Sequence, residues 1–196
     1  IWLALGVPAL AEIAAQQEAD AVVLDLQHGL WDRPSLEAAV GLAGAHAPVL
    51  VRSADLSHQA IATALDAGAS AVMAPLVETA EHAQALVSAG RYPPQGQRSG
   101  GGVRPLRGGM AGMLAMGAEV GLGAMIETAQ GVANAEAICA TSGLDFIFIG
   151  TGDLALSMPG ATERQLRAAC QQVLAAARRH RLPCGLFTPD AEAARQ

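Results

Sequence analysis

The sequence predicts an α/β fold of the (β/α)8 or TIM-barrel type, in which parallel strands alternate with covering helices. The first observation is that short apolar runs alternate with Ala-rich helical segments from one end of the chain to the other. The second is that polar positions stand at or just past the ends of such runs: residues 25–28, Arg52, Glu127 and the turn GTGD at residues 150–153. In a barrel, the carboxyl ends of all strands meet at one mouth, where groups from several strands can act together.

An open, doubly wound sheet would show the same alternation of strands and helices and is the alternative architecture. Such a sheet concentrates its ligand groups at one switch point and usually carries a Gly-rich first turn. The first turn here reads LGVPAL and has no GxGxxG motif. The barrel is therefore the better prediction.

Each expected strand is a short apolar run of the kind that a buried parallel sheet requires. In chain order, the strands are predicted at residues 2–5, 21–26, 49–52, 71–74, 123–126, 145–149 and 184–187. The Ala-rich segments between them predict helices at residues 9–17, 34–42, 58–66, 79–88, 132–140 and 163–179. Because a barrel needs eight strands, we expect a single domain over residues 1–196 that lacks its last strand and helix. The start at Ile1 instead of Met leads us to expect that the original N-terminus is missing too.

The composition excludes several functional classes. A net charge of −6 argues against a nucleic-acid surface. No apolar run reaches the roughly 18 to 20 residues of a membrane span, and no signal-peptide pattern is present, so we expect a cytoplasmic protein without membrane contact. The three cysteines, which are too widely spaced for a metal knot or redox motif, read as reduced core thiols: Cys139, Cys170 and Cys184.

All twelve basic residues are arginine. The absence of lysine removes Schiff-base chemistry from this segment, which matters for any carbonyl substrate.

One long irregular region, residues 89–109, is rich in Gly, Pro and Arg. Loops of this length are usually functional or form interfaces, although a flexible excursion is the alternative. Arg98 and Arg104 are candidates for holding an anion or a neighbouring subunit.

Two carboxylates are candidate metal ligands. Glu127 ends the run GLGAMIE, and Asp153 follows LDFIFIGTG. An ionised group at such a place is costly unless it is paired or binds a metal. Two oxygen ligands from separate strands, with no His or Cys close in sequence, suit Mg²⁺ or Mn²⁺ better than zinc, and Co²⁺ is a further candidate. A helix N-cap or an ion pair with arginine is the structural alternative for each carboxylate.

Arg52 and His28 are candidates for the chemistry itself. Arg52 closes the run PVLVR and could stabilise an oxyanion or enolate. Its structural alternative is a charge partner for Asp25 or Asp55. His28 is the histidine at a strand end, and in the company of these groups it is the best general-base candidate, although a lone histidine is more often structural.

The chain resembles the HpcH/HpaI family of class II pyruvate aldolases, of the 4-hydroxy-2-oxoheptanedioate aldolase type. The resemblance covers essentially the whole chain and rests on several ordered motifs: LALGVPALAEIAA, DAVVLDLQHG, PVLVRSAD, ALDAGASAVMAPLVET, RYPPQGQRS, AMIETAQGVANAEAI and FIGTGDLALSMPG. It implies a (β/α)8 barrel that assembles as a homo-oligomer, a hexamer, and exchanges its last helix between partners.

Residue by residue, the resemblance implies that His28 is the catalytic base and that Arg52 stabilises the enolate. Asp66 would be the acidic partner that raises the basicity of the histidine, acting from a neighbouring subunit. Glu127 and Asp153 would be the metal ligands. The backbone at two further positions, Thr151 and Gly152, would receive the substrate carboxylate.

Two positions depart from the family pattern. Met125 stands where some members carry a substrate-contacting Gln, which puts that contact in doubt. Gln27 stands where many relatives have Glu, so one fewer carboxylate lies beside His28. We expect Gln27 to contact substrate and to affect water placement or substrate preference.

The function expected from this resemblance is the reversible cleavage of a 4-hydroxy-2-oxo acid to pyruvate and a small aldehyde, dependent on a divalent metal. One alternative is a related barrel lyase that acts on an acyl-CoA ester, of the citrate-lyase-β or malyl-CoA-lyase type. Another is a non-catalytic barrel that serves as an assembly subunit.

Overall fold

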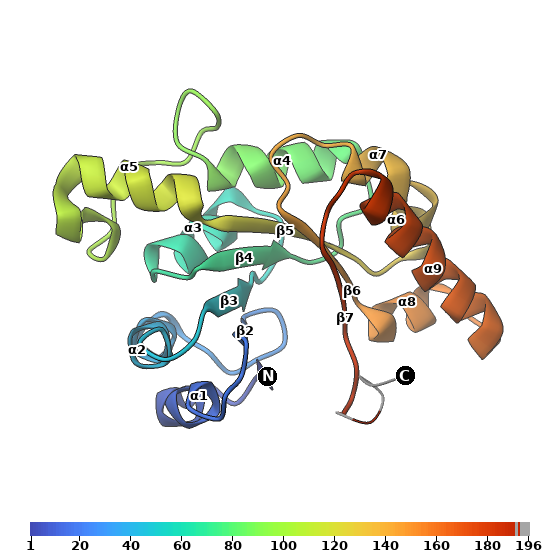
Figure 1. Cartoon of the computed structure of the whole chain (residues 1–196), viewed down its shortest axis with the longest axis horizontal. Helices are drawn as coiled ribbons and strands as arrows, with labels where there is room; N and C mark the ends of the chain where they lie inside the picture. The colour runs from blue at the N-terminus through green and yellow to red at the C-terminus, as the bar shows by residue number, and fades with distance from the viewer. Residues whose placement is uncertain (191, 193–196) are drawn as a thin grey trace. The chain divides into compact units, whose positions relative to one another are not determined.

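The computed structural model describes residues 1–190 and residue 192 (Figure 1). The chain divides into two compact units. The first unit comprises Ile1–Pro75 and Ala85–Leu122, and the second comprises Leu76–Gln84 and Gly123–Gln196. The prediction that residues 1–196 form one domain stays a prediction.

The first unit alternates strands and helices in chain order. Its strands are β1 (Trp2–Leu3), β2 (Val22–Asp25), β3 (Val49–Arg52) and β4 (Ala71–Ala74). Its helices are α1 (Pro8–Ala15), α2 (Arg33–Ala43), α3 (His58–Asp66), the short 3-10 helix η1 (Pro105–Gly108) and α5 (Gly109–Glu119). The strands pair in parallel, β1 with β2, β2 with β3 and β3 with β4, and α1 packs beside α2 (Figure 1).

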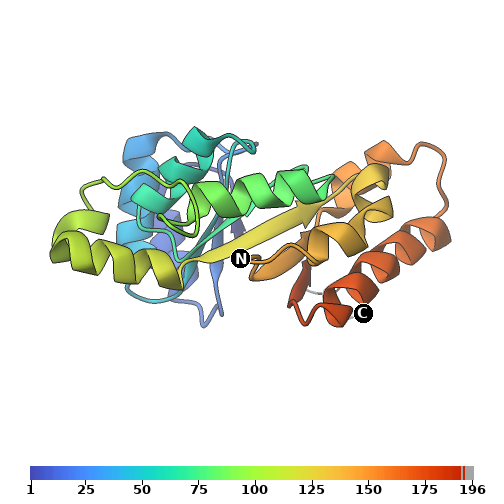
Figure 2. The same ribbon diagram turned by 90° about the horizontal axis from the view of Figure 1, so that it is seen from above.

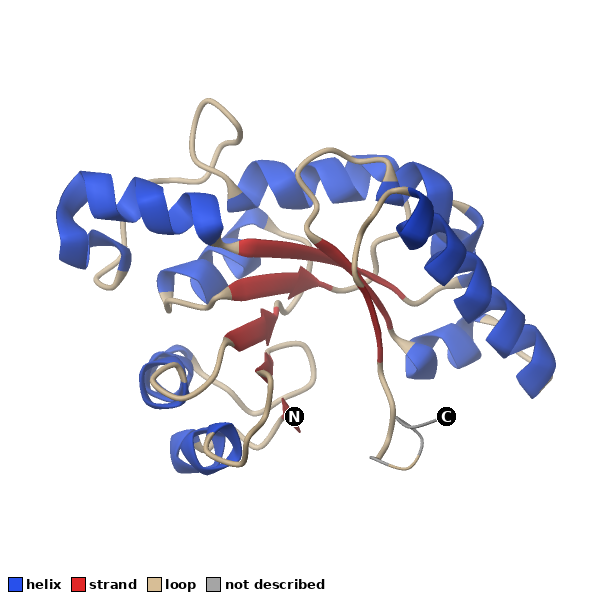
Figure 3. Ribbon diagram, viewed as in Figure 1, coloured by secondary structure: helices blue, strands red, loops and turns tan. Residues whose placement is uncertain are grey.

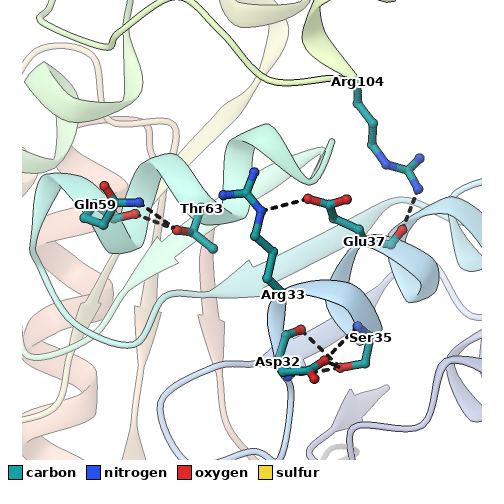
Figure 4. Close-up of polar contacts among 7 residues, drawn as sticks. All are labelled: Asp32, Arg33, Ser35, Glu37, Gln59, Thr63 and Arg104. Atoms are coloured by element: carbon teal, nitrogen blue, oxygen red, sulfur yellow. Dashed lines mark hydrogen bonds and ion pairs between the residues drawn. The ribbon is translucent and has the colours of Figure 1, made fainter.

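Helix α2 shows how the sequence after β2 sets the local structure. Asp32 is the N-cap, and its carboxylate accepts from the backbone N–H of Ser35 over 2.8 Å, while the Ser35 hydroxyl accepts from the backbone N–H of Asp32 over 3.0 Å (Figure 4). This reciprocal capping box, with Pro34 in the first turn, begins the helix directly after the turn that carries Gln27 and His28.

The second unit repeats the alternation. Its elements are α6 (Ala129–Ala133), α7 (Ala135–Cys139), β6 (Phe146–Ile149), α8 (Thr151–Ser157), α9 (Glu163–Arg179) and β7 (Cys184–Leu186). Helix α4 (Ala80–Gly90) and strand β5 (Gly121–Ile126) have residues in both units. Strand β6 pairs in parallel with both β5 and β7, and α9 runs beside α6 and α7 (Figure 2).

The predicted α/β class is confirmed: the described residues form seven strands in parallel pairs, with helices between them (Figure 3). All four residues of β4 are buried, as are five of the six in β5, as expected for parallel strands covered on both faces. In the described part of the chain, no helix is both long and apolar enough to span a membrane.

The helices of the structure differ from the predicted ones in four respects. Helices α5 and α8 were not expected, and η1 lies within the region predicted to be irregular. The single helix predicted at residues 132–140 is two short helices, α6 and α7, which meet at Asn134. Asn134 caps one helix and begins the other, and its side chain donates to the backbone oxygen of Glu78 over 2.8 Å.

Candidate active site

A buried ion pair joins the ends of β2 and β3. Asp25 and Arg52 are the last residues of these strands and lie opposite one another in the parallel register. Arg52 donates from Nε to Oδ1 of Asp25 over 2.8 Å and from Nη2 to Oδ2 over 2.5 Å, so the contact is bidentate. Of the two partners that the sequence left open for Arg52, the structure therefore shows Asp25. Asp55 instead accepts from the backbone N–H of Ser57 over 2.7 Å.

Asp25 also organises the turn after β2. Its Oδ1 accepts from the backbone N–H groups of Gln27 and His28 over 3.0 and 3.3 Å, and its Oδ2 accepts from Nε1 of Trp2 over 3.3 Å. Burial raises the pKa of Asp25, but the hydrogen bonds and charge of Arg52, aided by the His28 amide and Trp2, outweigh it and hold that pKa below its usual value. Asp25 is therefore ionised at neutral pH and holds both Arg52 and the turn.

His28 and Gln27 stand side by side in this turn. The His28 side chain is exposed, and within the described residues its imidazole makes no hydrogen bond or ion pair. Gln27 is half-buried, and its Oε1 is buried without a hydrogen-bond partner among the described residues. Gly29 follows, where a Cβ would overlap the backbone oxygen of Asp25, so the turn requires glycine. The roles predicted for His28 and Gln27 stay predictions.

Asp66, the last residue of α3, has a different partner from the expected one. Its Oδ1 accepts from Nη2 of Arg98 over 3.1 Å, and Arg98 is only 4% exposed. The Arg98 guanidinium also lies 4.6 Å from the centre of the Tyr92 ring, within cation–π range. Within the described chain, the structure does not join Asp66 to His28, so the predicted effect of Asp66 on the histidine stays a prediction.

The long region that contains Arg98 is tied to its own unit. Arg104 donates from Nη2 to the backbone oxygen of Glu37 in α2 over 2.5 Å, while the Glu37 carboxylate pairs with Arg33 over 2.9 Å (Figure 4). Arg98 and Arg104 therefore make internal contacts, with Asp66 and with α2. The anion site or subunit contact that the sequence suggested for these two arginines stays a prediction.

In the second unit, Glu127 directly follows β5 and is only 1% exposed. Its Oε1 accepts from the backbone N–H of Leu76 over 2.8 Å. On the other side stands Gly150, where a Cβ would overlap Oε2 and would lie 2.8 Å from the Cβ of Glu127. The carboxylate therefore occupies space that only glycine leaves open.

Asp153 is the third residue of α8, the helix whose N-cap is Gly150. Its side chain is half-buried and makes no hydrogen bond or ion pair within the described residues, so neither structural alternative for this carboxylate applies there. In the same turn, the Thr151 hydroxyl donates to the backbone oxygen of Phe187 over 3.1 Å. Gly152 is exposed and has open space beside it. The backbone N–H groups of this first turn have no partner within the helix.

Sequence reasoning missed three residues around Glu127: Leu76, Glu78 and Gly150. Glu78 could have been found, because it is a carboxylate shortly after β4, and its Oε1 accepts from Oγ1 of Thr128 over 2.8 Å. Gly150, the first glycine of GTGD, was expected only to form a turn and was given no role beside Glu127. Leu76 could not have been found from the sequence, since nothing about a leucine indicates that its backbone amide binds a carboxylate.

The donors of Glu127 and Asp153 fit a hard divalent cation, since carboxylate oxygens are the ligands that Mg²⁺ and Mn²⁺ prefer. Gly150 links the two residues, because Glu127 packs against it and it begins the helix that carries Asp153. Across the residues that the structure describes, no three His, Cys, Asp or Glu side chains form a ligand group. These two carboxylates suit an ion that keeps several positions for water and substrate.

The cysteines do not offer a competing nucleophile. All three are free. Burial raises the pKa of Cys139 to about 12 and that of Cys184 to about 11, and it also raises the pKa of Cys170. Such thiols are protonated at neutral pH and unreactive. Of the three cysteines predicted to be core thiols, Cys139 is buried and the other two are half-buried.

Curated relatives match most of the chain. A 4-hydroxy-2-oxovalerate aldolase of Novosphingobium aromaticivorans is 43% identical over 172 residues, which cover 86% of this chain and 64% of the relative. A hydroxypyruvate/pyruvate aldolase of Rhizorhabdus wittichii is 44% identical over 163 residues, which cover 80% of this chain and 63% of the relative. The matched region thus spans less than two thirds of the length of these relatives.

A solved structure and a family model match the chain from end to end. A crystal structure of an HpcH/HpaI aldolase/citrate lyase family protein from Burkholderia cenocepacia J2315 matches with a TM-score of 0.93 and 32% identity, covering 100% of this chain and 81% of that one. The HpcH/HpaI aldolase/citrate lyase family model matches residues 1–196. The chain therefore belongs to the HpcH/HpaI aldolase/citrate lyase family.

Proposed function

We propose that the protein is a divalent-metal-dependent aldolase that reversibly cleaves 4-hydroxy-2-oxo acids to pyruvate and an aldehyde. The main support for this proposal is the Glu127 carboxylate, which is 1% exposed at the end of β5. It packs against Gly150, the residue that begins the helix of Asp153. The relatives named above act, by their names, on different 2-oxo acids. The aldehyde partner is therefore left open, and the assembly is proposed to be a homo-oligomer, a hexamer.

In this proposal, Glu127 and Asp153 hold Mg²⁺ or Mn²⁺, with Co²⁺ as a further candidate. The ion, when bound, would polarise the ketone of the 2-oxo acid and make the adjacent carbon more acidic. The backbone at Thr151 and Gly152 is proposed to receive the substrate carboxylate, as the resemblance to the family implies, and both residues lie in the first turn of α8.

His28 and Arg52 are proposed to act on the reacting atoms. In addition, His28 takes a proton from the methyl group of pyruvate, and the enolate that forms adds to the aldehyde. In cleavage, the same imidazole takes the proton of the 4-hydroxyl, the C3–C4 bond breaks, the aldehyde leaves, and His28 returns that proton to C3 to give the methyl group of pyruvate. Arg52 stabilises the enolate oxygen between these events. Asp25 binds Nε and Nη2 of Arg52 and so fixes the direction of the guanidinium, whose Nη1 makes no hydrogen bond within the described residues.

Removal of the metal is expected to abolish turnover. Protein dialysed against excess EDTA should produce no aldol from pyruvate and a panel of aldehydes, as read by product mass, and Mg²⁺, Mn²⁺ or Co²⁺ should restore it. Full turnover in excess EDTA would contradict the metal assignment. If CoA competed with substrate, the result would favour the acyl-CoA lyase alternative, whereas metal binding without pyruvate enolisation would favour a non-catalytic barrel.

Replacing His28 by alanine is expected to slow deuterium exchange at the pyruvate methyl group by about 100-fold or more, because a general base typically contributes 10²- to 10⁴-fold. The exposed His28 side chain has no hydrogen bond to lose within the described residues, so folding and Mn²⁺ affinity should be unchanged. His46→Ala, at another exposed histidine of the same unit, is the control. NMR measures the exchange, and an unchanged rate in His28→Ala would remove His28 as the base.

A further inference from the structure

Leu76, the first residue of the second unit, has an unusual backbone. Its φ is +54°, in the left-handed region that residues other than Gly, Asn and Asp seldom adopt. Its side chain is 43% exposed, so burial of the leucine in the core does not account for this conformation. In this conformation, the Leu76 N–H donates to Oε1 of Glu127 over 2.8 Å.

The segment around Leu76, residues 75–79, is held to the strand end that carries Glu127 by further hydrogen bonds. The backbone N–H of Val77 donates to the backbone oxygen of Met125 over 3.0 Å. Glu78 accepts from Oγ1 of Thr128, the residue after Glu127, over 2.8 Å. Neighbouring contacts thus enforce the left-handed residue, as is typical of strained positions at functional sites.

We propose that Leu76 is a positioning residue of the metal site, which acts through its backbone amide on Glu127. This inference rests on the proposed function, because it takes Glu127 as a metal ligand. The amide donates to Oε1, and the absence of a side chain at Gly150 leaves the space that the carboxylate fills, so both features restrict the orientation of this buried group. A ligand that is oriented before the ion arrives loses less freedom on binding, which raises affinity.

Two substitutions at Leu76 test this role, because one favours a positive φ and the other disfavours it. Leu76→Gly keeps the N–H and adopts a positive φ without cost, so its Mn²⁺ affinity should stay within about twofold of wild type. Leu76→Val keeps the N–H but disfavours a positive φ strongly, so the amide should turn away from Glu127. Its Mn²⁺ affinity should fall about tenfold or more. Free Mn²⁺ is measured by electron paramagnetic resonance.

Arg181 supplies the matched control. It belongs to the same unit, is exposed and also has a positive φ, of 59°, but it lies in the turn before β7. Arg181→Val should lower the melting temperature as Leu76→Val does, yet leave Mn²⁺ affinity unchanged. If Leu76→Val bound Mn²⁺ as tightly as wild type, or if Arg181→Val lost as much affinity, the positioning role would be overturned.

A second measurement uses the metal-free protein. With leucine labelled with ¹⁵N, Glu127→Ala should speed hydrogen exchange at the Leu76 amide by about tenfold or more, because that amide loses its acceptor. An unchanged exchange rate would overturn the contact itself. A wild-type protein that keeps this protection but does not bind Mn²⁺ would instead overturn the proposed function, and the metal-positioning role with it.

Discussion

Replacing Asp25 by alanine is expected to lower the free energy of unfolding by about 3 to 5 kcal/mol, the usual cost of removing one partner of a buried ion pair. The variant would leave the Arg52 charge, which is 6% exposed, without its carboxylate. It would also remove the acceptor of the Trp2 indole and of the backbone N–H groups of Gln27 and His28. Urea denaturation followed by circular dichroism measures the loss.

Two comparisons separate this effect from the loss of any aspartate. Asp55→Ala removes an exposed carboxylate with one backbone partner and should cost about 1 kcal/mol or less. The double variant Asp25→Leu, Arg52→Met should lose less stability than Asp25→Ala, because no buried charge is left alone. An Asp25→Ala variant within about 1 kcal/mol of wild type would show that the pair does not stabilise the fold.

The same pair sets a pH dependence. Because the pKa of Asp25 is lowered in the folded protein, its ionised form stabilises the fold above the ordinary carboxyl pKa of about 3.9. That contribution is lost as the pH falls through the lower folded pKa. Asp25→Asn, which has no such proton to bind, should therefore lose less stability than wild type on acidification.

Replacing Gly150 by alanine is expected to lower Mn²⁺ affinity by about 10- to 100-fold, the range found when groups that support metal ligands are changed. The new Cβ would lie 2.8 Å from the Cβ of Glu127 and 2.9 Å from Cε of Met125, and it would overlap Oε2 of the carboxylate. The methionine can move aside, but Glu127 is also held by the Leu76 amide, so its carboxylate has to leave its place.

Gly112→Ala is the control for this substitution, since Gly112 lies in α5 with nothing near the position of a Cβ. It should leave metal affinity unchanged and make α5 slightly more stable, because alanine favours helix over glycine. Isothermal titration with Mn²⁺ and thermal melting should be run on both variants. If Gly150→Ala melted lower but bound Mn²⁺ as wild type does, the glycine would serve folding alone.

Much of the fold could be predicted because buried parallel strands are short apolar runs that the sequence displays directly. The strands expected at residues 49–52 and 71–74 and the helix expected at 163–179 coincide with β3, β4 and α9. Helix α5 was missed because the segment GMAGMLAMGAE carries three glycines that weaken the helical pattern. Helix α8 was missed because it begins directly after β6, where GTGD reads as a turn.

The candidate site was less accessible to sequence reasoning because its contacts join distant segments. The sequence named Asp25 as one of two partners for Arg52, since both stand at strand ends. It gave no way to pair Asp66 with Arg98, 32 residues away, or the Leu76 amide with Glu127, 51 residues away. Every residue except proline carries a backbone N–H, so the identity of Leu76 does not indicate that its amide binds a carboxylate. The pairing of Asp66 with Arg98 depends on how distant segments fold together, and local sequence patterns do not specify this.

The two backbone hydrogen bonds that Asp25 accepts from Gln27 and His28 separate the motion of the His28 side chain from that of its main chain. The main chain at His28 is pinned, whereas its ring is exposed and makes no hydrogen bond within the described residues. If His28 is the base, as proposed, its imidazole can be reoriented toward a substrate by a change of side-chain rotamer while the main chain keeps these two hydrogen bonds. Exposed side chains change rotamer in picoseconds to nanoseconds, far faster than an enzyme turns over.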